Sequence, residues 1–322
     1  MEPILQIEHL SIEFVQYEHR TGKARAGLGM HKRSLPVIRD LCLDIYPGQI
    51  VAVAGASGSG KSLLAHSILD ILPYSSRREG VIRYEGNILT PERTEELRGR
   101  EIVLVPQGVT YLDPLMKVGP QLWKGKKDRE AKQRYRRGLK RYGMEPETEG
   151  LYPFELSGGM ARRVLIASAS AEKPRLIIAD EPTPGLDVRA AKRILGHFRE
   201  LADEGAGILF ITHDLELALS IADRVAVFYA GETIEEAAAA DFSDISGLRH
   251  PFTKALWKAM PEHGFEPVPG AQPYPGQVRK GCLFAGQCTK CRSECLSCEN
   301  IPLQPYRGGM VRCLYPGEEE SR

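Results

Sequence analysis

A glycine-rich segment, GASGSGKS at residues 55–62, constrains this chain more than any other feature of its sequence. It follows a short apolar run, IVAVAG at 50–55, and opens a segment rich in leucine and isoleucine at 61–72. The order predicted is a buried strand, a tight turn and a helix. In such a turn the backbone N–H groups point inward, and the helix N-terminus adds partial positive charge. The segment therefore predicts a site for the phosphates of a nucleotide.

The residue types within this segment suggest separate roles. Glycines allow the backbone to curl around an anion. Lys61 is placed to neutralise the β- and γ-phosphates, and the Ser62 hydroxyl is a ligand for Mg²⁺. The residues expected to contact the nucleotide are Gly55, Ser57, Gly58, Ser59, Gly60, Lys61 and Ser62.

A second apolar run ends in two acids, as a nucleotide site of this kind requires. LIIAD at 176–180 is followed directly by Glu181. Because the carboxyl ends of parallel strands face the ligand crevice, both acids are expected near the phosphates. Asp180 would hold Mg²⁺ through its water shell, and Glu181 would polarise the attacking water as a general base.

Apolar strands alternate with helices along most of the chain, which predicts an α/β fold with a largely parallel sheet. The strands are expected at 4–15, 37–45, 50–55, 101–107, 175–180 and 207–213, and helices at 61–72 and 188–204. Residues 108–172 lack strand patterns and predict an inserted helical subdomain. The composition changes near 240, so we expect one domain over 1–240 and a small cysteine-rich extension over 241–322.

Charge and hydropathy exclude several classes of protein. Lys plus Arg (43) nearly balances Asp plus Glu (42), which gives no argument for a nucleic-acid partner. No apolar stretch approaches the roughly 20 residues of a membrane-spanning helix, so a cytosolic chain is expected. The basic segments 18–36 and 124–141 predict a surface loop and a solvated helix face. Attraction to an anionic membrane surface is the alternative for both.

The sequence LSGGM at 156–160, together with the segments above, resembles the ATP-binding cassette family. The resemblance implies a P-loop NTPase (RecA-like) core that binds ATP and Mg²⁺ and hydrolyses ATP. In that family Ser157, Gly158 and Gly159 would bind the γ-phosphate of a nucleotide held by an opposite subunit. Each subunit is then half of each site, so a hetero- or homodimer with a second cassette ATPase is implied.

Further positions match the family in the expected order. Gln107 resembles the Q-loop glutamine, which senses Mg²⁺, water and the transport partner. Asp187, in PGLD, resembles the D-loop residue that crosses the dimer interface. His213 resembles the switch histidine that contacts the γ-phosphate. Phe14 is the aromatic expected to stack on adenine, with Tyr17 as the second choice.

A closer resemblance is to the importer branch for oligopeptides, dipeptides and nickel. It rests on YPFELSGGMARR at 152–163, YLDPLMKVG at 111–119 and RHPFTKAL at 249–256. Arg162 departs from the branch, which usually carries glutamine there. The resemblance implies two membrane permeases, an extracytoplasmic binding protein and a place on the cytoplasmic face of the membrane. A cassette ATPase not coupled to transport, or a degenerate nucleotide-binding subunit of a heterodimer, is the alternative.

Six of the seven cysteines fall between 282 and 313. In a cytosolic chain such a cluster indicates metal before disulfides. Members of the resembling branch carry a frame that Cys282, Cys288, Cys295 and Cys313 fit, and some hold a [4Fe-4S] cluster there. Zn²⁺ bound by four thiolates is the nearest alternative, and reduced thiols or disulfides also remain open. Cys291 and Cys298 are additional, so the ligand set stays ambiguous.

Overall fold

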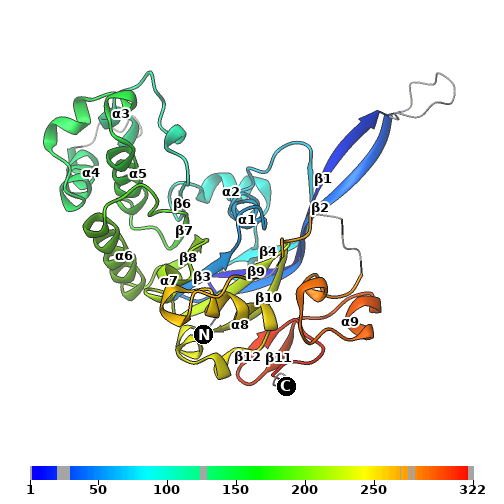
Figure 1. Ribbon diagram of the computed structural model, residues 1–322. Coiled ribbons are helices and arrows are strands. Elements are labelled where there is room, and N and C mark those ends of the chain that lie inside the picture. The colour runs from blue at the N-terminus through cyan, green and yellow to red at the C-terminus, as the bar shows by residue number, and fades with distance from the viewer. Residues whose placement is uncertain are drawn as a thin grey trace.

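An eight-stranded mixed sheet organises the molecule, described here from a computed structural model (Figure 1). The structure describes residues 2–19, 30–123, 129–268, 270–274, 277 and 280–317. Five strands run parallel, in the order β9 (Arg224–Tyr229), β3 (Ile50–Gly55), β8 (Gly207–Thr212), β7 (Leu176–Asp180) and β6 (Ile102–Val105). Three antiparallel strands continue the sheet beyond β9, namely β10 (Glu232–Ala238), β12 (Gly309–Val311) and β11 (Gln304–Tyr306).

A second, antiparallel sheet consists of β2 (Met30–Ile45), β1 (Leu5–His19), β4 (Ser76–Tyr84) and β5 (Asn87–Ile88). The loop predicted over 18–36 is wrong at both ends, because β1 continues to His19 and β2 begins at Met30. The two strands pair in register from Val15↔Ser34 to His19↔Met30. A polar hairpin needs no apolar alternation when the backbone hydrogen bonds are satisfied by the partner strand. The basic residues at 20–29 lie outside the described part.

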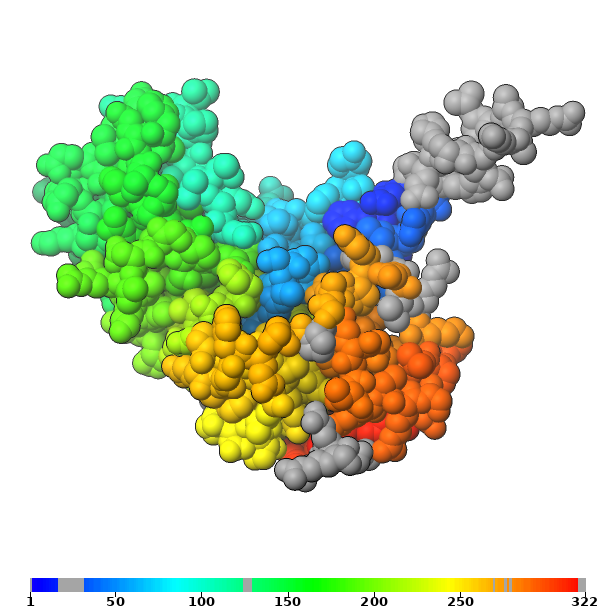
Figure 2. All heavy atoms as spheres, in the orientation of Figure 1, coloured from blue at the N-terminus to red at the C-terminus, as the bar shows by residue number. Residues whose placement is uncertain are grey.

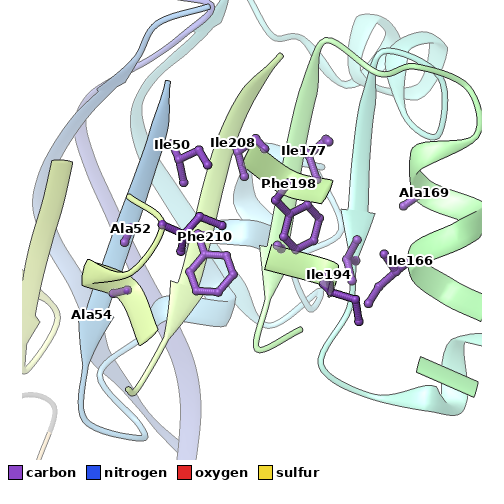
Figure 3. Close-up of a cluster of buried hydrophobic side chains, with 14 of the residues drawn as sticks. Ile50, Ala52, Ala54, Ile166, Ala169, Ile177, Ile194, Phe198, Ile208 and Phe210 are labelled. Carbon is purple, nitrogen blue, oxygen red and sulfur yellow. The ribbon is translucent and has the colours of Figure 1, made fainter. Parts of the chain in front are cut away.

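Apolar side chains cover both faces of the main sheet. One face packs against α5 (Gly158–Ser170) and α6 (Val188–Asp203), with Phe210 of the sheet close to Phe198 of α6 (Figure 3). The other face packs against α1 (Lys61–Ile68) and the antiparallel sheet. The parallel strands β3, β7 and β8 are buried along their whole length and read as continuous apolar runs, which is why the sequence showed them clearly.

The region predicted as an inserted helical subdomain is largely helical. It contains α3 (Val118–Leu122), α4 (Arg129–Arg141) and α5, joined by 3-10 turns at Val109–Tyr111, Pro146–Gly150 and Pro153–Glu155. Figure 2 shows it as a lobe of its own (green), on the side of the molecule opposite the C-terminal residues (orange to red). α4 buries Ala131, Tyr135 and Leu139 and turns its basic residues outward. Residues 124–128 of the predicted basic segment lie outside the described part.

The remaining helices are short. They are α2 (Pro91–Leu97), α7 (Leu215–Leu219), α8 (Pro251–Lys258) and α9 (Ser293–Ser297), with 3-10 turns at Ala239–Ser243, Ile245–Gly247, Pro261–His263 and Ala285–Gln287. In the ranges that the structure describes, none of the helices combines the length and the apolar character needed to cross a bilayer.

Helix α1 ends earlier than predicted, at Ile68 rather than near residue 72. Asp70 adopts a left-handed backbone conformation (φ 52°), which breaks the helical repeat. Arginines from elsewhere satisfy the carbonyls at this end: Arg78 donates to the Ser67 oxygen at 2.8 Å and Arg98 to the Leu69 oxygen at 3.1 Å. These long-range bonds fix where the helix ends and have no local sequence signal.

Two buried arginines fasten the C-terminal residues to the cassette. Arg249 donates to Glu235 of β10, to Asp241 and to the Tyr306 oxygen of β11, at 3.3, 2.7 and 2.8 Å. Arg312 donates to the Thr233 oxygen of β10 and to the Asp40 oxygen of β2, at 3.1 and 3.0 Å. The hairpin β11–β12 thus extends the main sheet. The domain boundary expected near 240 stays a prediction, and these hydrogen bonds join the residues on its two sides.

Candidate active site

The glycine-rich turn between β3 and α1 has the conformation that its sequence predicts. Gly60 caps the helix with a left-handed backbone (φ 99°), and a Cβ added at Gly55 would lie 2.5 Å from the Phe228 oxygen of β9. Glycine is therefore needed at both places, once for conformation and once for space. Lys61 Nζ spans the turn and donates to the Gly55 and Ala56 oxygens at 2.7 and 2.9 Å.

A cavity of about 330 Å³ lies over this turn. It brings together residues from β2, the glycine-rich turn, the end of β6 and the end of β7. Its lining consists of Val37, Ser57, Gly58, Gly60, Lys61, Ser62, Leu63, Gln107, Asp180 and Glu181. Gly55 and Ser59, also predicted as contacts, are buried at the base of the turn. Val37 was missed by sequence reasoning, since only the fold brings β2 beside Gly60.

The acid at the end of β7 is arranged for a cation. Asp180 is 4% exposed, and its Oδ1 atom has no hydrogen-bond partner within the described ranges. Burial raises the pKa of its carboxyl group, and a hydrogen bond to Ser62 opposes that shift. A buried carboxylate oxygen beside a serine hydroxyl is a donor set that suits Mg²⁺. Ser62 and Asp180 therefore fit a magnesium site, with Gln107 on the same cavity.

Lys61 is buried among these groups with 7% of its surface exposed. Burial lowers the pKa of its ammonium group, and the carboxylates of Glu181 and Asp180 raise it again. The phosphates of a nucleotide would bring further negative charge to the same ammonium, which favours its charged form.

Glu181 and His213 meet at the edge of the cavity. His213 Nδ1 lies 2.7 Å from Glu181 Oε1, with Glu181 8% and His213 55% exposed at the side chain. His213 comes from the end of β8, and Glu181 has a left-handed backbone (φ 49°) that turns it away from its strand. His213 lines a neighbouring groove with Thr183 and Gly185, and Glu181 borders both spaces. The geometry thus suits Glu181 as a general base and His213 as the residue that orients it.

Arg162 contributes to this site in a way that sequence reasoning missed. From α5 it donates to the backbone oxygen of Gln107 at 2.5 Å and also to the backbone oxygen of Glu181. Its side chain is buried, and burial lowers the pKa of its guanidinium while Glu181 and Asp180 raise it. One side chain thus joins the loops that carry Gln107 and Glu181 to the helix that follows LSGGM.

The LSGGM segment lies elsewhere. Ser157 caps α5 by accepting a hydrogen bond from the Met160 N–H at 3.2 Å, and Ser157 and Gly158 are exposed. A Cβ added at Gly159 would lie 3.4 Å from the Gly185 oxygen. Asp187, two residues after Gly185 in the chain, is the N-cap of α6. None of these described residues lines the cavity over the glycine-rich turn.

Phe14 also lies away from that cavity's lining. It sits on β1 and pairs with Leu35 of β2 and Ser76 of β4. Its role in stacking on adenine therefore stays a prediction. The side chain of Tyr17 lies outside the described part.

Four cysteines converge on a small cavity of about 20 Å³ in the C-terminal extension. Cys282, Cys288, Cys295 and Cys313 line it, together with His250 at the start of α8. Burial raises the pKa of Cys282 to about 12, with smaller raising effects from the other three thiols. Burial also raises the pKa values of Cys288 and Cys313. Buried thiols that repel one another as thiolates suit a cationic centre, which would relieve that repulsion.

The fold and the first cavity together define a P-loop ATPase in which residues on or next to four strands meet over the glycine-rich turn. A profile of the ABC transporter family matches residues 38–184, and a profile of the oligopeptide/dipeptide transporter C-terminal region matches 234–295. The chain belongs to the ABC transporter family, as a subunit that binds and hydrolyses ATP.

The similarity to known transport proteins extends over most of this chain. The oligopeptide transport ATP-binding protein AppD of Bacillus subtilis is 34% identical over 308 residues, covering 89% of this chain and 93% of that protein. The probable D,D-dipeptide transport ATP-binding protein DdpD of Escherichia coli is 32% identical over 341 residues, covering 99% and 98%. Among solved structures, the dimeric ABC transporter cassette MJ0796 superimposes with a TM-score of 0.60 at 23% identity, covering 73% of this chain and 98% of that one. That likeness shows the cassette fold.

Proposed function

We propose that this chain powers an importer for peptides, as one of two ATPases that share their nucleotides. The observation that carries the proposal is the separation of two phosphate-binding elements: the cavity with Lys61 and the exposed helix start at Ser157. A helix N-terminus that faces solvent offers its N–H groups to an anion on another molecule. A second cassette, related by symmetry, would therefore complete each site.

The remaining parts of the proposed assembly are those that the family resemblance implies. The chain works at the cytoplasmic face of the membrane, beside two permeases that receive the motion of the dimer, with an extracytoplasmic protein that delivers cargo. The names of AppD and DdpD support peptide cargo. Nickel or another metal chelate is the other cargo that the sequence suggests, and uptake measured with labelled peptide and with ⁶³Ni²⁺ separates the two. The same names support coupling to transport over a free-standing or degenerate cassette.

The roles of the chain's own residues follow from the geometry. The glycine-rich turn and Lys61 would bind the β- and γ-phosphates, and Ser62 and Asp180 would hold Mg²⁺, whose charge would stabilise the phosphate oxygens. Glu181 accepts the proton of the attacking water. His213, 2.7 Å from Glu181 Oε1, orients that carboxylate. Ser157, Gly158 and Gly159 of one chain, and Asp187 beside them, would contact the nucleotide of the other.

Glu181→Gln tests the enzymatic part of this proposal. The variant should bind ATP as the wild type does and lose hydrolysis by about 10²–10⁴-fold, since only the base is removed. Glu95→Gln, the same chemical change at an exposed position of α2, is the matched control. In ATP, the Glu181→Gln protein should sediment as a dimer, and adding Ser157→Trp should return it to a monomer. Undiminished turnover, or a dimer that ignores Ser157→Trp, would refute the proposal.

The cysteine cavity supports a second proposed feature, a [4Fe-4S] cluster held by Cys282, Cys288, Cys295 and Cys313. Four thiolates around one Zn²⁺ stand about 3.8 Å apart, given Zn–S bonds of about 2.3 Å. All six cysteines of the extension are described, and no three of their sulfur atoms lie within 4.8 Å of one another. The wider spacing favours a polynuclear centre over a single ion. Iron and zinc analysis of anaerobically purified protein tests this: one zinc and no iron per chain would overturn it.

A further inference from the structure

A histidine on the lining of the cysteine cavity carries a buried nitrogen without a hydrogen-bond partner among the described residues. His250 is 1% exposed and lines that cavity, and its Nε2 atom has no partner among the residues that the structure describes. A buried polar group left unpaired costs about 1–3 kcal/mol, so most such groups in folded proteins are satisfied. The position therefore requires an explanation beyond packing.

The other ring nitrogen fixes which proton His250 carries. Nδ1 accepts a hydrogen bond from the Phe252 N–H at 3.0 Å, as the cap of α8. An acceptor Nδ1 in a neutral ring leaves the hydrogen on Nε2, which is then a donor. The backbone also holds the residue, because the His250 N–H donates to Glu235 Oε2 at 2.7 Å. The imidazole is thus locked with an unpaired Nε2–H, in a ring that lines the cysteine cavity.

The cavity offers sulfur as the acceptor. Burial raises the pKa values of Cys282, Cys288 and Cys313, and hydrogen bonds with the backbone at Phe284, Lys290 and Tyr315 partly offset that rise, so three of the four sulfurs already interact with N–H donors. A side-chain N–H in the same cavity extends this pattern. Hydrogen bonds to the sulfurs of an iron–sulfur centre stabilise its more negative, reduced form and raise its potential.

We infer that His250 donates its Nε2 hydrogen to a sulfur of the centre that the four cysteines hold, and thereby sets that centre's reduction potential. The inference rests on the proposed cluster. His250 is a positioning and tuning residue, and the four cysteines remain the ligands. It also gives a reason for the histidine in the HPFT segment, which carries both the helix cap and the cavity donor.

Two substitutions separate those two functions. His250→Asn keeps an oxygen that caps α8 but is too short to reach the cavity. His250→Gln places an amide N–H near the position of Nε2. With the cluster intact by iron content and absorbance, His250→Asn should shift the one-electron reduction equilibrium toward the oxidised form by about tenfold, or about 59 mV. His250→Gln should shift it much less.

Potentiometric titration followed by electron paramagnetic resonance measures these shifts. An unchanged potential in His250→Asn, with full iron content, would overturn the inference and leave the proposed cluster standing. A wild-type protein that binds zinc alone would overturn both. If His250→Asn fails to take up iron, wild-type protein with ¹⁵N-labelled histidine decides. A weak ¹⁵N coupling with an exchangeable proton supports the hydrogen bond, whereas a strong coupling, which means direct Fe–N ligation, or no coupling contradicts it.

Discussion

The two cavities of this chain are built in opposite ways. The cavity over the glycine-rich turn is open, about 330 Å³, and surrounded by loops that the Ser157 segment of another molecule would complete. The cysteine cavity is about 20 Å³ and is lined by residues between His250 and Tyr315. A ligand that is exchanged in every cycle needs access and a movable wall, whereas a permanent group needs neither. The contrast agrees with the proposal of an exchanging nucleotide at the first site and a resident cluster at the second.

Replacing Lys61 in the cavity over the glycine-rich turn should have the largest effect, and that effect should be confined to ATP hydrolysis. Lys61→Met deletes the ammonium that faces the phosphates and keeps most of the stem, so hydrolysis should fall about 10³-fold. Iron content and cluster absorbance should stay at the wild-type level. A parallel loss of iron would mean that the cavities do not fold independently. ATPase assays of the assembled complex and metal analysis on one preparation measure both.

Removing a contact that holds the C-terminal residues to β10 should affect the cysteine cavity and leave the nucleotide cavity unchanged. Arg249→Met leaves Glu235, which is fully buried, without its cationic partner, and such a loss costs about 3–5 kcal/mol. The free energy of unfolding should fall by that amount in a denaturant titration, and iron content should drop with it. Lys258→Met, at a partly exposed residue of α8, is the control that should change neither. Equal ATP binding by both variants would sharpen the distinction between the cavities.

Arg162 tests how rigid the open site must be. Arg162→Met removes the bonds to the Gln107 and Glu181 oxygens and should lower kcat about tenfold, with a loss of about 2 kcal/mol in stability. Arg162→Gln, which restores the residue usual in the branch, should recover part of both. Equal kcat in all three proteins would show that the loops are held by other contacts.

The smallest effect concerns pH. His197 of α6 is buried against Tyr142, and burial lowers the pKa of its imidazole to about 4 from 6.5. The unfolded chain binds a proton in that window and the folded chain does not, so stability is complete above pH 6.5 and declines as the pH falls toward 4. His197→Gln should flatten the slope by about one proton. Denaturant titrations at pH 7, 6 and 5 measure it, and identical slopes would contradict the assignment.

The sequence predicted what short segments determine by themselves. The strand, the turn and the start of the helix around Lys61, the acids at the end of β7 and the histidine after β8 were placed correctly, because each depends on neighbours along the chain. Arg162, Arg249 and Arg312 could not be predicted as anchors, since the partners described above lie 8 to 272 residues away. The hairpin beyond Val15 was missed for a related reason: its strands are stabilised by pairing and lack an apolar pattern. The frame of four cysteines came from family resemblance, and no spacing rule alone would have set aside Cys291 and Cys298.

The last strand of the main sheet is followed two residues later by Cys313, so the pairing of β12 with β10 has a consequence for biogenesis. During translation the outer edge of β10 stays open until residues 309–311 leave the ribosome, and an open edge invites pairing with other chains. The fourth thiol arrives with the strand that closes this edge. Iron held by all four cysteines could therefore bind only after β12 is available to pair with β10, when the edge that promotes aggregation is covered.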